Sequence, residues 1–299
     1  MRTGFRARLG RLRHAIQRPP DDGAVPPAPG YDSWLEQVAG DELARIDAAF
    51  AAGRADGLAA FRGLDTDLWA LLLTLEYDAY PHLRAALPDV PDPSLQQRWT
   101  GVSGAALAAQ SAAFTRRLYE RFAQHGARPL SEATVLDFGC GWGRLTRMVA
   151  RDVPRERLFG CDPSQDILDV CRDTGVPARF ARSELLPDRI PFDEQFDLAF
   201  AFSVFTHLSE PAHERCLRAI HAALRPGGVL VVTVRPPSYL GVSSDAGYAF
   251  VPHPGEMTYG EAVVTLPYVR ERWSEMFALL DADILLDDLF QVMLTLRRA

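Results

Sequence analysis

The residues best able to do chemistry form a glycine-rich turn that is preceded by an acid. Residues 135–138 read as a short buried strand, and Gly139, Gly141 and Gly143 follow it directly. Glycines in a strand-to-helix turn let a nucleotide approach the backbone closely, because they carry no Cβ. Dinucleotide sites space these glycines as G-x-G-x-x-G, whereas the third glycine here comes one residue earlier. Asp137 would repel a pyrophosphate and suits a ligand that carries an ammonium or sulfonium charge.

A second acid stands at the predicted end of the next strand. Asp162 follows residues 157–161 and comes 25 positions after Asp137. A carboxylate at this place can accept both hydroxyls of a ribose, one on each oxygen. The alternative is that it caps the following helix, a role that Ser164 could also take. The two acids, in this order and at the ends of adjacent strands, favour a nucleoside site.

Together these segments resemble class I S-adenosylmethionine-dependent methyltransferases. Residues 137–143 are similar to the first motif of that family, and Asp162 is similar to its ribose-binding acid. Residues 196–200 resemble its fourth strand, and 224–228 resemble the turn before its fifth. The resemblance covers residues 130–234 firmly and a C-terminal strand pair more loosely. It implies S-adenosyl-L-methionine as cofactor and an α/β fold, Rossmann-like and doubly wound, with a seven-stranded sheet whose last strand is antiparallel.

The resemblance also implies which residues near the strand ends contact the cofactor. Those of the first two motifs are Asp137, Gly139, Cys140, Gly141, Gly143, Arg144, Asp162, Pro163 and Ser164. Many family members place an acid after the third strand to contact the adenine amino group. Residues 181–184 read Ala-Arg-Ser-Glu here, so Ser183 is the expected substitute. Phe202 and Ser203, at the end of the fourth strand, are expected on the adenine side of the pocket.

The N-terminal half supplies three further candidates. Arg98 and Thr100, beside Gly101, could bind the methionine carboxylate, because the planar donors of arginine match a carboxylate. The helical region that holds them, residues 31–128, is either a structural cap on the sheet or a lid that closes over cofactor and acceptor.

His207 is the candidate catalytic residue. It follows an apolar strand whose carboxyl end should open on the cofactor, and imidazole titrates near neutral pH. It could therefore take a proton from an acceptor hydroxyl as the methyl group arrives, or position the acceptor. The alternative is that His207 hydrogen-bonds the start of the helix at Ser209.

A closer resemblance concerns the acceptor. Residues 203–208 resemble a bacterial subgroup often associated with glycan and natural-product pathways. A Trp-Thr-Gly segment, here residues 99–101, recurs in that subgroup, and so does a Tyr-Gly segment followed by a helix with a tryptophan, here Tyr259-Gly260 and Trp273. The expected function is methyl transfer to a small-molecule or sugar-containing acceptor.

Two other functions are weighed against this one. The first is a protein that binds S-adenosylmethionine without catalysis and uses its N-terminal helical region to dock a partner. The second is a dinucleotide-dependent oxidoreductase, which the glycine spacing disfavours.

The order of predicted elements divides the chain into three parts. Residues 1–30 form a basic tail and Pro-rich linker, 31–128 the helical region, and 129–299 the S-adenosylmethionine-binding domain. In the helical region Asp41 and Asp65 are predicted to cap helices, and a long helix is expected over 105–124. Strands are expected at 134–138, 157–161, 178–181, 196–202, 229–234, 277–286 and 291–296, and helices at 144–151, from Ser164, from Ser209 and at 268–276. Strands separated by helices predict right-handed crossovers and a parallel sheet.

The composition excludes several kinds of chemistry and partner. The 299 residues carry a formal charge of −7, and all 32 basic residues are arginine. The absence of lysine excludes Schiff-base and P-loop chemistry. Beyond residue 20 the balance is 26 Arg against 39 acids, or −13, which argues against nucleic acid as a partner. Four cysteines without metal-ligand spacing predict a reduced, cytoplasmic protein without a metal site, and no apolar run is long enough to span a membrane.

The basic tail allows two interpretations. Within residues 1–18, Phe5, Leu9, Leu12 and Ile16 lie at helical spacing with arginines on the other face. Such a helix would contact a membrane surface or a partner. The alternative is a frayed, solvated terminus.

Overall fold

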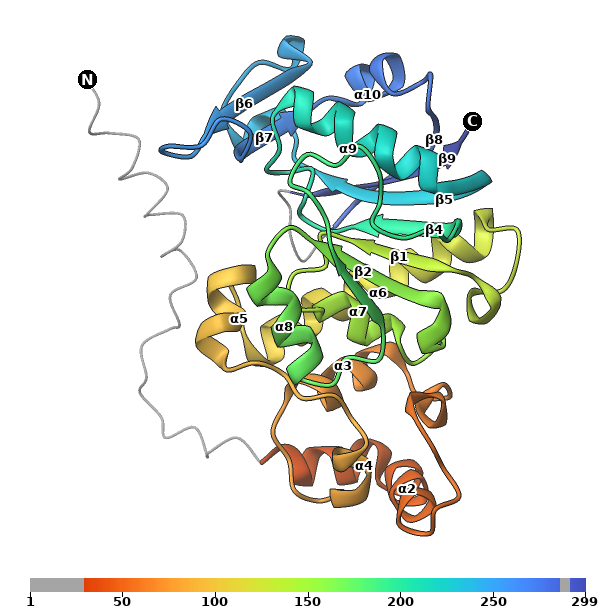
Figure 1. Cartoon of the computed structure of the whole chain (residues 1–299). Helices are drawn as coiled ribbons and strands as arrows, with labels where there is room; N and C mark the ends of the chain where they lie inside the picture. The colour runs from red at the N-terminus through yellow and green to blue at the C-terminus, as the bar shows by residue number, and fades with distance from the viewer. Residues whose placement is uncertain (1–29, 286–290) are drawn as a thin grey trace, which may run out of the picture.

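The computed structural model describes residues 30–285 and 291–299. The predictions for the tail before Gly30 and for an acidic turn at Asp287-Asp288 lie outside these ranges. Within them, the chain forms an α/β fold around one large sheet, and the segment that precedes the sheet in the sequence is helical (Figure 1). No helix in the described ranges is both long and apolar enough to cross a membrane.

A seven-stranded sheet organises the molecule, in the order β3-β2-β1-β4-β5-β9-β8. In chain order these strands are β1 Val135–Phe138, β2 Leu158–Asp162, β3 Arg179–Arg182, β4 Phe196–Ala201, β5 Leu224–Val234, β8 Phe277–Ile284 and β9 Val292–Arg298. The first five run parallel, while β9 pairs antiparallel with both β5 and β8. The predicted fold class, with seven strands and the last one antiparallel, is confirmed.

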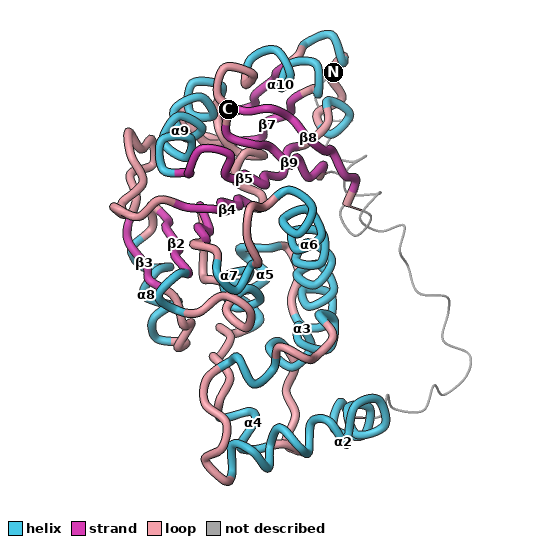
Figure 2. The backbone as a smooth tube through the Cα atoms, turned by 90° about the vertical axis from the view of Figure 1, so that its right-hand side faces the viewer, coloured by secondary structure: helices cyan, strands magenta, loops and turns pink. Residues whose placement is uncertain are grey.

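Helices cover both faces of this sheet, as parallel strands require. They are α7 Arg144–Val149, α8 Gln165–Asp173, α9 Glu210–Ala223 and α10 Leu266–Arg272. Figure 2 shows α9 on one face and α6 (Gly104–His125) and α7 on the other. Residues of β4 are buried along its whole length, which fits a central strand with apolar groups on both sides.

The N-terminal helices are α2 Tyr31–Ala51, α3 Thr66–Thr74, α4 Pro81–Ala85, α5 Pro93–Thr100 and α6 Gly104–His125. The predicted cap at Asp65 is confirmed, because its Oδ1 accepts hydrogen bonds from the backbone of Asp67 and Leu68. A helix start was predicted at Asp41, and α2 has a break close by: the backbone of Ala39 is not helical, so the second half of α2 begins just before Asp41. The first half, which holds the buried Leu35, was not predicted.

One buried cluster joins these helices to the sheet. Phe114, Leu118 and Phe122 on α6 lie in the same cluster as Leu198 and Phe200 of β4. The ring of Phe114 lies 6.2 Å from that of Phe200 between centroids. The long helix was predicted as an apolar stripe, and the structure shows that this stripe covers one face of the sheet.

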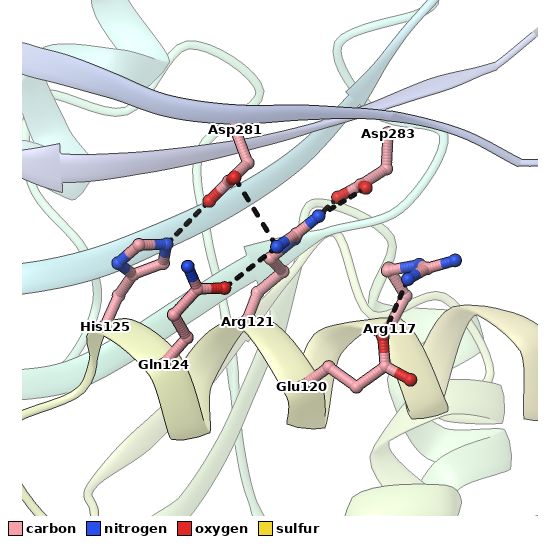
Figure 3. A network of polar contacts seen from close by, with 7 residues as sticks. All are labelled: Arg117, Glu120, Arg121, Gln124, His125, Asp281 and Asp283. Atoms are coloured by element: carbon pink, nitrogen blue, oxygen red, sulfur yellow. Dashed lines mark hydrogen bonds and ion pairs between the residues drawn. The ribbon is translucent and has the colours of Figure 1, made fainter.

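The C-terminal end of α6 is also fixed by charge. Arg121 donates to both carboxylate oxygens of Asp283 on β8, at 2.7 and 2.5 Å, and His125 Nε2 lies 2.6 Å from Asp281 Oδ2 (Figure 3). These side chains are mostly buried, so the contacts are less screened than surface ion pairs. They hold α6 against the edge strand of the sheet.

A two-stranded hairpin was not predicted. Strands β6 Tyr248–Pro252 and β7 Gly260–Val264 pair antiparallel in a region that was expected to be irregular. The hairpin is joined to the body through the segment after β4: Gly260 N donates to His207 O at 2.8 Å and Ala262 N to Thr206 O at 2.9 Å. Figure 1 shows this hairpin and α5 on the same side of the sheet.

The four cysteines are buried, and none of them forms a disulfide.

Candidate active site

A cavity of about 580 Å³ opens beyond the carboxyl ends of the parallel strands. It lies where the strand order reverses between β1 and β4, the place where open α/β sheets bind ligands. Residues that follow β1, β2, β4 and β5 line its floor, α5 contributes one wall, and the hairpin contributes Tyr259 and Glu261.

The glycine turn forms one end of the cavity, as predicted. Gly139 has φ of 71°, a conformation that other residues rarely adopt. A Cβ at this position would also lie only 2.4 Å from Cγ2 of Val204, which follows β4. Gly139 N and Cys140 N both donate to Cys161 O, so the turn is tied to β2. The glycine therefore serves both the turn itself and the close approach of two loops.

Asp162 organises this turn from the end of β2. Its Oδ2 accepts from Gly141 N at 3.0 Å and its Oδ1 from Ser164 N at 2.9 Å. Burial raises the pKa of this carboxyl, and the two backbone hydrogen bonds oppose the rise. Ser164 occupies the N-cap position of α8 without a side-chain cap, and Asp162 binds the amide of that residue rather than an amide of the helix. Each oxygen keeps acceptor capacity toward the cavity, so the ribose contact remains a prediction.

Asp137 lies deeper, at 2% exposure. Its Oδ2 accepts from the Thr146 hydroxyl at 2.6 Å. Burial raises the pKa of Asp137 to about 7, and the hydrogen bond from Thr146 and the charge of Arg144 oppose that rise. A cationic ligand in the cavity would favour the ionised form.

Most of the predicted site residues come together around this cavity. Those that line it are Asp137, Gly139, Cys140, Gly141, Arg144, Asp162, Pro163, Ser164, Ser183, Phe202, Ser203, Thr100, Gly101 and His207. Gly143 does not line it and instead packs near Cys171 and Val176, where a Cβ would meet their side chains.

The structure does not bring Arg98 to the cavity. Its Nη1 donates to Ser94 Oγ on the same helix, and its side chain is exposed. The hydroxyl of Thr100 lies 2.7 Å from Gln96 O and 2.8 Å from Val102 O, which commits its proton to the backbone. Consecutive helical residues point about 100° apart, so α5 directs the neighbouring Trp99 into the cavity instead.

Trp99 makes α5 a roof over the glycine turn. Its Cε3 lies 3.6 Å from where a Cβ of Gly141 would stand, and the side chain is 49% exposed. Leu95, also on α5, packs against a small apolar cluster of Leu107, Trp142 and Ile167. A ligand in the cavity would therefore contact α5 as well as the sheet.

Arg147 holds together two backbone segments near α5. It is fully buried, and it donates to Trp142 O at 2.7 Å and to Asp89 O at 3.1 Å. Burial lowers its pKa to about 10, so the guanidinium stays charged at neutral pH. The residue thus joins the glycine turn to the segment that leads into α5.

His207 stands at the other end of the cavity. Its Nδ1 lies 2.8 Å from Gly260 O, and because a carbonyl only accepts, Nδ1 carries the proton and Nε2 the lone pair. Burial and the charge of Arg235 lower the pKa of His207, opposed by the bond to Gly260 and by Glu261. The imidazole is therefore neutral at pH 7. The alternative partner at Ser209 is wrong, since Ser209 N donates to Thr258 O.

The hairpin and the end of β5 add residues that sequence reasoning missed. The ring of Tyr259 stacks on that of His207, at 5.3 Å between centroids and 19°. Arg235 forms an ion pair with Glu261 and lies 4.2 Å over the ring of Tyr239. The apolar run 262–264, between Glu261 and Thr265, was the available signal for β7.

The comparisons agree with this fold. Residues 135–228 match the family described as methyltransferase domain. This part of the chain is therefore similar to a methyltransferase domain, in agreement with the resemblance to class I S-adenosylmethionine-dependent methyltransferases.

The chain is similar to particular members of this class. It is 33% identical over 125 residues to a trans-aconitate 2-methyltransferase of Variovorax paradoxus, covering 38% of this chain and 47% of that one. It is 33% identical over 108 residues to a ubiquinone biosynthesis O-methyltransferase of Methylobacterium, covering 35% and 41%. The matched part thus spans less than half the length of either relative. Among solved structures, magnesium protoporphyrin IX methyltransferase of Synechocystis aligns with a TM-score of 0.49 at 15% identity, over 69% of this chain and 94% of that one.

The crowding at Gly139 gives a prediction with an internal control. Gly139→Ala and Gly175→Ala both place a side chain at positive φ, but only Gly139 has an atom in the way. We expect Gly175→Ala to cost about 1–2 kcal/mol in free energy of unfolding, the penalty for left-handed backbone. Gly139→Ala should cost a further ~1–3 kcal/mol from overpacking. Urea unfolding measures both, and equal losses would mean that Val204 yields without strain.

Proposed function

We propose that this chain is an S-adenosylmethionine-dependent methyltransferase that methylates a hydroxyl of an uncharged small-molecule or sugar-containing acceptor. The observation that carries the proposal is that one cavity holds both the glycine turn with Asp162 and the neutral imidazole of His207. The first belongs to a nucleoside site and the second to proton transfer.

The residues present fit S-adenosylmethionine. Gly139 and Gly141 leave room at the turn that a side chain would fill, and Asp162 has acceptor capacity for ribose hydroxyls. Phe202 and Ser183 line the cavity where the adenine is expected, and Asp137 suits the positive charge of the ligand. When bound, the cofactor supplies a methyl group that is already activated on a sulfonium.

His207 supplies what remains of the chemistry. An acceptor hydroxyl must lose its proton as it is methylated, and the Nε2 lone pair of His207 is available to take it. A carboxylate acceptor has no such proton at neutral pH and would not need the base. A neutral imidazole in this place therefore supports a hydroxyl acceptor.

Charge supports an uncharged acceptor. At the His207 end, Arg235 is already paired with Glu261. The other arginine that lines the cavity in the described part of the chain, Arg144, donates to Gln110 Oε1 at 2.5 Å and lies 4.8 Å over the ring of Phe202. Among the described residues, a tricarboxylate such as trans-aconitate would thus meet near His207 an arginine that is already paired with a carboxylate. Methylation of a hydroxyl oxygen, which the name of the Methylobacterium relative allows, agrees better with this arrangement than methylation of a carboxylate.

A second candidate function has one observation in its favour. Tyr31, Trp34 and Val38 lie at helical spacing on α2 and are 45, 36 and 58% exposed. Such a stripe suits a partner surface, as in a cofactor-binding protein that docks through its helical region. Binding of S-adenosylmethionine without turnover on any acceptor would favour this function.

Calorimetry tests the cofactor. We expect S-adenosylmethionine and S-adenosylhomocysteine to bind and NAD not to bind. Asp162→Ala should weaken the binding of S-adenosylmethionine by about 1.5–3 kcal/mol, the range for hydrogen bonds to a charged group. Asp188→Ala, an exposed acid outside the cavity, is the control. Tight NAD binding without a response to S-adenosylmethionine would refute the proposal.

An acceptor panel tests the substrate class. We expect methyl transfer to neutral sugars or phenols, with product mass and position showing O-methylation. Each neutral acceptor should exceed its carboxylated counterpart by at least about tenfold in kcat/KM, because a carboxylate on the acceptor would have to compete with Glu261 for Arg235. Turnover of trans-aconitate at a higher rate than of the neutral compounds would contradict the assignment.

The role of His207 is tested in the same assay. His207→Gln should lower kcat by about 10²–10⁴-fold, the usual contribution of a general base, with cofactor affinity nearly unchanged. Because the pKa of His207 is lowered from 6.5 and the base must be unprotonated, wild-type activity should rise through a midpoint below pH 6.5 and level off above it. Near-normal turnover of the variant would return His207 to a structural role.

A further inference from the structure

One carboxylate, that of Glu261 on β7, serves three basic groups at the acceptor end. Its Oε2 forms the ion pair with Arg235. Its Oε1 lies 3.3 Å from Nε2 of His253 and 3.8 Å from Nδ1 of His207. The same oxygen therefore faces two histidines.

The contact with His207 is electrostatic rather than a hydrogen bond. The Nδ1 proton of His207 is already donated to Gly260 O at 2.8 Å. At 3.8 Å, Glu261 does not compete for that proton but places a negative charge beside the ring. The remaining groups that face His207 in the described chain are Arg235, His253 and the ring of Tyr259.

The balance of these charges decides whether His207 can hold a proton. Arg235 alone would oppose an imidazolium at this place, and Glu261 offsets part of that opposition. Arg235 is itself held over the ring of Tyr239 and lies mostly buried, so the carboxylate that it binds has little freedom to move. Glu261 is thus fixed where a charge on His207 would form.

We propose that Glu261 is a positioning residue for the methyl transfer proposed above, on which this inference rests: its carboxylate, held by Arg235, stabilises the imidazolium that His207 forms on taking the acceptor proton. The acceptor O–H bond breaks as the new O–CH3 bond forms, and the proton goes to Nε2 of His207. The electron pair of the broken C–S bond stays on sulfur. The proton then leaves Nε2 for water when the product departs.

His253 is the more exposed of the two histidines, and it contacts the same carboxylate oxygen that faces His207. Its side chain is 43% exposed, against 17% for His207. The two rings lie 6.4 Å apart between centroids. A proton on His253 would neutralise Glu261 and repel a second proton on His207, so the two histidines share one carboxylate in competition.

A titration of His207 in the full chain tests the proposal without donor or acceptor. The ring Cε1–H signals of the seven histidines are followed by NMR against pH, and His207→Gln assigns the signal of His207. Glu261→Gln should lower the pKa of His207 by about one unit or more, since an opposite charge nearby favours the charged form. His253→Gln should raise it by a smaller amount, because a repelling group is lost. Glu120→Gln on α6, a residue paired with Arg117, is the control and should leave it unchanged.

Two outcomes would overturn the proposal: a His207 pKa that is the same in Glu261→Gln as in wild type, or one that falls in His253→Gln. Because Glu261→Gln leaves Arg235 without its ion-pair partner, folding is checked by circular dichroism. If that variant unfolds, two others decide whether Glu261 acts on the pKa of His207. They are Glu261→Asp, which keeps the negative charge on a shorter side chain, and His253→Gln. A protein that failed to bind S-adenosylmethionine would still give this titration, so the two failures are distinguishable.

Discussion

The arrangement of the cavity depends on how closely two loops approach where the strand order reverses. The turn after β1 and the segment after β4 lead to opposite faces of the sheet, and a gap between them is the usual ligand site of such folds. Here the loops come so near that a single methyl group on Gly139 would overlap Val204. That approach sets the width of the floor between the glycine turn and His207, three residues beyond Val204.

From this floor the two ends of the cavity are built by different means. The cofactor end is a backbone structure, in which Asp162 and Cys161 O hold the turn through amide hydrogen bonds. The acceptor end is a side-chain structure, in which Glu261, Arg235 and Tyr259 surround His207. Backbone geometry suits one invariant ligand, while side chains can vary with the acceptor. This difference explains why the fold alone does not identify the acceptor.

Sequence reasoning succeeded where the signal was local. The strand and glycine turn at 135–143 and the cap at Asp65 depend on neighbours in sequence, and the structure confirms them. It failed where tertiary contacts decide. The first half of α2, before the break near Asp41, was missed, because the burial of Leu35 depends on residues far away in the sequence. The hairpin strand β7 is held by the backbone at Thr206 and His207, more than fifty residues away, which no local pattern reveals. The segment predicted around residues 98–101 does reach the cavity. The orientation of α5, however, places Trp99 and not Arg98 in the cavity lining.

The shared core of α6 and the sheet bears on where this chain can be divided. The helix covers β4 through Phe114 and reaches the edge strand β8 at Asp283, so it extends from the middle of the sheet to one edge. A fragment that began at residue 129 would carry the entire set of parallel strands and the cofactor turn. It would also present Leu198 and Phe200 to water on a face that parallel sheets keep dry. The methyltransferase motifs thus mark a unit of sequence that is smaller than the unit of folding.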